Sequence, residues 1–111
     1  MPKPTTQERV ARLMSEASLQ ANVIELAEAL GYTVAHIRDS RAQQVVGYPD
    51  LVVAGHRRII HAELKVEHGK LTPAQELWRG LILDAGHDWY LWRPSSWLDG
   101  TIERVLKEEI P

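Results

Sequence analysis

The sequence contains two short apolar runs that each carry charged residues, PDLVVA at residues 49–54 and IIHAELK at residues 59–65. Both runs are rich in β-branched residues, and the segment GHRR between them is short and polar, so a β-hairpin is predicted. With the turn centred in GHRR, opposed residue numbers sum to about 113. The hairpin therefore places Asp50 across from Glu63.

The opposition of Asp50 and Glu63 indicates a cation site. Opposed Cβ atoms lie roughly 5 Å apart on one face of a sheet, where two carboxylates repel unless a proton or a cation lies between them. Hard cations such as Mg²⁺ and Mn²⁺ take oxygen ligands, so the pair predicts a site for one of these ions. Because side chains alternate along a strand, Lys65 is expected beside Glu63. The other face should enter a core with Ile60, Ala62, Leu64 and Val66.

Length and composition favour one domain over residues 1–111, without a second domain or a disulfide framework. The chain has 111 residues and no cysteine, which excludes a thiolate zinc site and leaves oxygen ligands for a metal. The start is polar, and no apolar run approaches the ~20 residues of a membrane span. A cytoplasmic location is expected, in a bacterial or phage-infected cell.

Charge is distributed unevenly, although the formal net charge is only -2. Residues 31–70 hold six basic and four acidic side chains, whereas residues 1–30 hold three and four. A basic rim around the predicted site would contact phosphates, and its alternative is a set of ordinary solvated charges. The candidates in this segment are Arg38, Arg41, Arg57, Arg58 and Lys70.

The order of predicted elements indicates an α/β fold with a central mixed β-sheet flanked by helices. Capping patterns and apolar spacing predict helices from Thr5 and over residues 15–30, 73–85 and 102–109. Strands are predicted at residues 32–38 and 87–93 beside the hairpin, with Pro94-Ser95-Ser96 as a break. The helix between the hairpin and the last strand is long enough for a parallel crossover, which places the hairpin near the sheet centre.

Several motifs together resemble the VRR-NUC type of the PD-(D/E)XK nuclease superfamily, in its small stand-alone form often found in phage genomes. The core of the resemblance is Gly47-x-Pro49-Asp50 followed by Glu63-Leu64-Lys65, with Tyr48 in the variable position. Further matching segments, over roughly residues 15–106, are Ser15-Glu16-x-x-x-Gln20, Leu30-Gly31-Tyr32, His36-x-Arg38-Asp39-Ser40, Gly69-x-Leu71-Thr72-x-x-Gln75 and Trp92-Arg93-Pro94.

The resemblance implies a restriction-endonuclease-like fold and phosphodiester cleavage that depends on Mg²⁺ or Mn²⁺. It also implies a frequent homodimer that acts on branched DNA such as Holliday junctions. Two alternatives remain open. One is a restriction or recombination-associated endonuclease without structure preference, and the other is a non-catalytic DNA-binding accessory module of the same fold.

Roles for individual residues follow from the resemblance and from the chemistry of phosphodiester hydrolysis. Asp50 and Glu63 would hold the ion with the Leu64 carbonyl, and Lys65 would orient or deprotonate the attacking water. The resemblance places Glu16 and Gln20 beside the site, with Glu16 as a ligand through water or for a second ion. Gln75 would hold substrate or Lys65, although Glu16 also suits a first-turn acid and Gln75 a capping box.

Histidines and tryptophans complete the candidate set. His61 shares the face of Glu63, but the five histidines show no tight metal-ligand spacing. The four tryptophans are interpreted mainly as core or interface aromatics, with base stacking as the alternative; they are Trp78, Trp89, Trp92 and Trp97.

Overall fold

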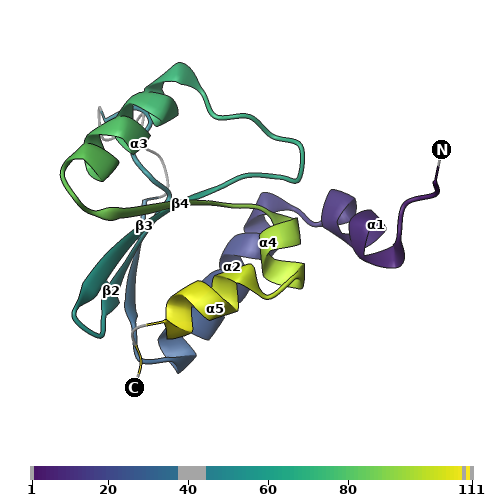
Figure 1. Cartoon of the computed structure of the whole chain (residues 1–111), viewed down its shortest axis with the longest axis horizontal. Coiled ribbons are helices and arrows are strands. Elements are labelled where there is room, and N and C mark those ends of the chain that lie inside the picture. Colours follow the sequence, from purple (N-terminus) through teal and green to yellow (C-terminus); the bar gives the residue numbers. More distant parts are fainter. Residues whose placement is uncertain (1, 38–44, 109, 111) are drawn as a thin grey trace.

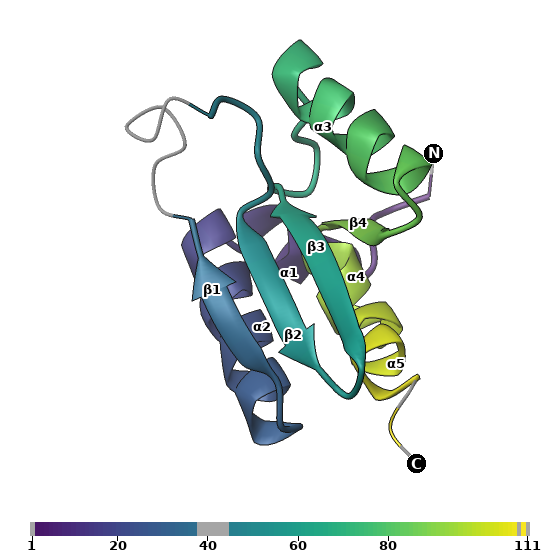
Figure 2. The ribbon, with the colours of Figure 1, turned by 90° about the vertical axis from the view of Figure 1, so that its left-hand side faces the viewer.

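Four strands form one mixed sheet with helices on both faces, in a computed structural model that describes residues 2–37, 45–108 and 110. The strands are β1 (Thr33–His36), β2 (Leu51–Gly55), β3 (Arg58–Leu64) and β4 (Asp88–Trp92). The helices are α1 (Thr6–Leu13), α2 (Glu16–Ala29), α3 (Pro73–Asp84), α4 (Pro94–Leu98) and α5 (Thr101–Lys107). Figures 1 and 2 show α2, α4 and α5 together on one side of the sheet and α3 apart from them.

The hairpin of β2 and β3 has the predicted register. Leu51 pairs with Ala62 and Gly55 with Arg58, so that opposed numbers sum to 113 as expected. His56 and Arg57 form the turn with φ values of 48° and 65°, the left-handed conformation typical of two-residue hairpin turns. Both the turn position and the register of the hairpin are therefore confirmed.

The sheet order is β1-β2-β3-β4, with antiparallel pairing except between β3 and β4. The parallel pair aligns Leu64 with Trp92, and α3 forms the crossover between these strands. The predictions of a mixed sheet, a parallel crossover and a central hairpin are confirmed. Within the described residues, no helix combines the length and apolar character needed to cross a membrane.

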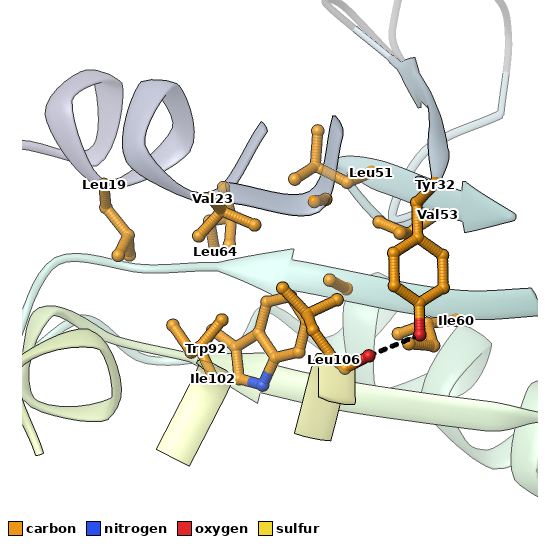
Figure 3. Close-up of a cluster of buried hydrophobic side chains, with 12 residues drawn as sticks. Leu19, Val23, Tyr32, Leu51, Val53, Ile60, Leu64, Trp92, Ile102 and Leu106 are labelled. Atoms are coloured by element: carbon orange, nitrogen blue, oxygen red, sulfur yellow. Dashed lines mark hydrogen bonds between the residues drawn. The ribbon is translucent and has the colours of Figure 1, made fainter. Parts of the chain in front are cut away.

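The main core lies between the sheet and the side that carries α2 and α5 (Figure 3). Leu19, Val23 and Ala27 of α2 are buried there, while Leu26 and Leu30 are partly buried against the cluster. The Tyr32 hydroxyl donates a 2.6 Å hydrogen bond to the Leu106 carbonyl (Figure 3). The opposite sheet face remains free of this core.

One sequence prediction about the core is wrong, and one helix was not predicted. Val66 was expected in the core but is 45% exposed, because β3 ends at Leu64 and the alternation of a strand stops there. The strand break predicted at Pro94-Ser95-Ser96 is confirmed, because β4 ends at Trp92, but α4, which starts there with Pro94 in its first turn, was not predicted. A proline that lacks an N–H is tolerated at that position, so the same residue ends β4 and begins a helix.

Position 47, just before the Pro49-Asp50 pair, requires a glycine. Its φ is +89°, and a Cβ at this position would overlap the backbone carbonyl of Ala74 in the first turn of α3. The segment before β2 therefore packs directly on the start of α3. This close contact sets where α3 begins relative to the hairpin.

We expect Gly47→Ala to lower the free energy of unfolding by about 2 kcal/mol, because it adds both a backbone strain and an overlap with α3. The matched control is Gly80→Ala, within α3, where an added Cβ meets no atom within 4 Å. That change should raise stability by about 0.5–1 kcal/mol. Urea unfolding of both variants measures the difference, and equal effects would contradict the packing described for Gly47.

Candidate active site

The two carboxylates predicted to oppose each other meet at one end of the hairpin. Asp50 directly precedes β2, and Glu63 is the next-to-last residue of β3. Asp50 Oδ2 accepts a 2.9 Å hydrogen bond from the Leu64 backbone N–H, so the carboxylate extends the pairing of the strands. Glu63 is only 2% exposed, which is unusual for a glutamate that has no cationic hydrogen-bond partner.

Burial and a neighbouring carboxylate together raise the pKa of Glu63 to about 9. Desolvation is the largest cause, followed by the negative charge of Asp50 and a hydrogen bond with it, while the Lys65 ammonium acts in the opposite direction. Glu63 therefore keeps its proton near neutral pH. A divalent cation bound between the two carboxyl groups would replace that proton and remove the repulsion.

Gln75 connects Glu63 to the first turn of α3. Its Nε2 donates to Glu63 Oε1 at 2.9 Å, and its Oε1 accepts from the Thr72 N–H at 2.9 Å. The Thr72 hydroxyl accepts in return from the Gln75 N–H at 3.2 Å, which confirms the predicted capping box. The sequence did not reveal the contact with Glu63, because the partner of the Gln75 amide depends on where α3 lies.

Glu16 and Lys65 extend the electrostatic group around Asp50. The pKa of Glu16 is raised by burial and by the charge of Asp50, and Lys65 opposes the shift. Glu16 is the first residue of α2, whose N-cap is Ser15, and Gln20 follows one helical turn later. The N-terminal ends of α2 and α3 thus both lie at this end of the sheet, where helix dipoles favour negative charge.

The described part of the chain contains no group of three or more His, Asp or Glu side chains arranged to hold a metal ion. In this arrangement Glu16 is not grouped with Asp50 and Glu63. Asp50 and Glu63 form the oxygen-donor pair. Any further ligands would come from the backbone, water or substrate, as is common for Mg²⁺.

The structure separates some predicted phosphate-binding residues from the site. Arg57 lies in the hairpin turn, six residues from Glu63 along the strand, or about 20 Å at 3.3 Å per residue. The Arg58 side chain is 10% exposed and donates to the Val105 carbonyl and to Asp88. Arg58 therefore does not lie in a rim around the carboxylates, because its guanidinium joins β3 to β4 and α5. Arg57 does not belong to a rim around the carboxylates.

Lys70 remains at the site end of the sheet, in the segment from Lys65 to Thr72 that joins β3 to α3. Two contacts that the sequence did not reveal hold this segment. Arg93 donates to the Gly69 carbonyl at 2.7 Å, and Glu67 accepts from the Ser95 N–H at 3.0 Å. Arg38 and Arg41 lie outside the described residues.

Comparisons with known proteins agree with this geometry. No protein-family model matches the sequence, and no curated protein gives a significant match. A solved structure described as a VRR_NUC domain is 28% identical with a TM-score of 0.68, over 79% of this chain and 94% of that chain. Another, described as a VRR_NUC domain protein, is 18% identical with a TM-score of 0.65, over 85% and 89%.

The mixed sheet, its flanking helices and the site at the hairpin end define an α/β protein of the restriction-endonuclease-like fold, as the sequence predicted. The chain is therefore similar to VRR_NUC domain proteins in fold and, at 28% identity to one of them, in sequence. Its assignment to the small stand-alone phage type stays a prediction.

We expect Glu63→Gln to stabilise the metal-free protein at alkaline pH. From about pH 4.5 to about pH 9 the folded wild type retains a proton that the unfolded chain has released, so its stability falls as the pH rises. Glutamine does not titrate and keeps a hydrogen-bonding side chain, so its melting temperature should exceed that of wild type most at about pH 9.

Thermal melts in EDTA across this pH range measure the effect. Glu25→Gln, an exposed glutamate on α2, controls for the loss of one negative charge. A wild-type profile parallel to that of Glu63→Gln would show that Glu63 does not carry the proton.

Proposed function

We propose that this protein is a nuclease that hydrolyses DNA phosphodiester bonds and depends on a divalent metal ion. The observation that carries the proposal is the buried Glu63 carboxyl, opposed to Asp50 and held by Gln75, at the end of the sheet where Lys65 lies. A buried carboxyl beside a second carboxyl is costly for a protein that has no cation to bind there. The names of the similar solved structures support a nuclease of this fold.

The donor set fits Mg²⁺ or Mn²⁺. Asp50 and Glu63 would hold the ion with their carboxylate oxygens, and the resemblance adds the Leu64 carbonyl. When bound, such an ion supplies charge neutralisation of the phosphate, a lowered pKa for attacking water and stabilisation of the leaving oxygen. Glu16, whose carboxyl is coupled to that of Asp50, would contact the ion through water or help to hold a second one.

Other groups of the chain would position the substrate and move the proton. Lys65 would orient the attacking water or accept its proton, since its ammonium lies close enough to influence both Glu16 and Glu63. Gln75 keeps the Glu63 carboxyl in place. The N-termini of α2 and α3 would favour a phosphate group, with Gln20 and Lys70 as contacts to the substrate backbone.

We further propose that the protein acts as a homodimer on branched DNA. Each 12.6 kDa chain carries one candidate site, so cutting two strands of a junction symmetrically requires two copies related by a twofold axis. Helix α1 leaves Leu13 85% exposed, which provides apolar surface for a second copy to cover. The alternative is a nuclease without structure preference. Cleavage of a panel of DNA substrates of different structure distinguishes the two.

We expect Asp50→Asn and Glu63→Gln each to abolish cleavage while DNA binding stays within a few-fold of wild type. Both changes remove a negative charge from the ion-binding pair but keep the size of the side chain. The measurement is cleavage of single-stranded, duplex, flap and four-way substrates with Mg²⁺, Mn²⁺ or EDTA. Preference for four-way substrates would support junction specificity.

Glu76→Gln is the matched control, because this exposed glutamate lies next to Gln75 but outside the pair. It should retain cleavage. Near-normal cleavage by either variant of the pair would overturn the metal assignment, and a protein that binds DNA but cuts none of the substrates would be an accessory module.

We expect Lys65→Ala to lower the turnover rate by orders of magnitude with little change in metal affinity, because a protonated lysine cannot ligate a cation. Lys70→Ala is the control for the loss of a nearby positive charge and should act on DNA affinity more than on turnover. Single-turnover cleavage at saturating metal, with calorimetric metal titration, separates the two effects. Normal turnover of Lys65→Ala at saturating metal would contradict the role.

A further inference from the structure

A pocket opens beside the candidate active site, on the sheet face that carries Glu63. Its volume is about 300 Å³, and it lies between β3 and α3. Its walls include the side chains of Tyr48, Ile59, His61, Trp78, Leu81 and His87. None of these residues has a part in the proposed hydrolysis.

Aromatic rings form one side of the pocket. The Tyr48 and Trp78 rings meet edge to face with centroids 5.0 Å apart, and Tyr48 and His61 meet in the same way at 6.4 Å. In an edge-to-face pair only one of the two rings uses a face for the contact. The arrangement therefore leaves flat apolar surface for a further planar group.

The pocket combines this surface with apolar walls and polar edges. Ile59 is 45% exposed and Leu81 50% exposed, although both are large aliphatic residues. His61 is held by a 3.1 Å contact between its Nδ1 and the Asp88 carbonyl. A carbonyl only accepts, so Nδ1 carries the hydrogen and Nε2 remains for another partner.

The pocket and the carboxylate pair share one face of β3. His61 lies two residues before Glu63 on β3, and Tyr48, in the segment before β2, packs against His61. Two residues of a strand span about 7 Å and point to the same face. A phosphate at the carboxylates would thus bring the base of an adjoining nucleotide to the pocket entrance.

We propose that this pocket receives one unstacked nucleobase of the substrate, from a nucleotide adjoining the scissile phosphate. The proposal rests on the proposed nuclease function and defines its substrate more closely. A paired base would first have to be flipped out of the duplex at a cost of a few kcal/mol, so the pocket favours a nucleotide that is already unpaired, as in a single strand, a flap or the branch point of a junction.

A nucleobase fits the pocket better than a second copy of the chain does. The pocket is concave and has the mixed character of base-binding sites, with aromatic surface for stacking and a few hydrogen-bonding edges. It also adjoins the end of the sheet where the substrate phosphate would bind. Stacking on aromatic rings tolerates every base, so we expect little sequence preference.

The test measures binding of single-stranded oligonucleotides in EDTA, with an abasic site placed at each position in turn. Wild type should lose about tenfold in affinity when the missing base is the one that enters the pocket. Trp78→Leu should bind the intact strand about tenfold more weakly and should be insensitive to the abasic position. The control is Leu83→Ala, which is 44% exposed on the same helix but outside the pocket, and which should keep the wild-type pattern.

Several outcomes would overturn the proposal. Wild type with no sensitive position excludes a bound base, and an equal abasic effect in wild type and Trp78→Leu places the base elsewhere. Light scattering that shows Trp78→Leu to be a monomer and wild type a dimer, without any abasic effect, assigns the pocket to a second copy. Tyr48→Leu repeats the test if thermal melts show Trp78→Leu to be unfolded.

Failure of this proposal and failure of the nuclease function give different results. Binding in EDTA does not depend on cleavage. A position-specific abasic effect without cleavage of any substrate would therefore support the base-binding pocket and contradict the nuclease function. Metal-dependent cleavage without an abasic effect would support the nuclease function and contradict the base-binding pocket.

Discussion

The burial of the Glu63 carboxyl is the constraint on which the rest of the site depends. Removing a carboxylate from water costs several kcal/mol unless it is neutralised or paired, and here the side chain is 2% exposed with another carboxyl beside it. The protein meets this cost with a retained proton and with a hydrogen bond from Gln75. This arrangement requires three elements to keep their relative positions. They are β2, which directly follows Asp50, β3, which contains Glu63, and α3, which contains Gln75.

Contacts at both ends of the hairpin maintain this register. At the end remote from the site, His56 Nε2 donates to the Leu30 carbonyl at 2.6 Å, which attaches the hairpin turn to the C-terminal end of α2. At the site end, Gly47 packs on Ala74 and the Asp50 carboxylate accepts from the Leu64 N–H. The hairpin is thus fixed to a different helix at each end. A displacement of either helix would be transmitted to the carboxylate pair.

The sequence predicted the parts of the site that are local in the chain. The short turn determined the hairpin register, and the register determined that Asp50 opposes Glu63. The contact of Gln75 with Glu63 was not predictable, because it depends on the direction in which the β3–α3 segment returns to the sheet. The contacts of Arg58 were not predictable for a similar reason, since its partners Asp88 and Val105 are 30 and 47 residues away in sequence. The sequence predicted that Pro94 breaks a strand but not that it begins α4, because a proline is equally typical of a strand break and of a first helical turn.

Within the described residues, the site end of the sheet offers few cations for the phosphate contacts that the proposed nuclease would make. The net charge is -2, Arg57 and Arg58 lie at the far end of the hairpin, and Lys65 and Lys70 are the cations of the β3–α3 segment at the site. Each phosphate contact adds affinity that weakens as salt rises, so few such contacts give a small salt dependence. Stacking of a base on aromatic side chains is less sensitive to salt and adds affinity per nucleotide. The pocket of Tyr48 and Trp78 beside the carboxylates therefore supports the proposed preference for a substrate with an exposed base.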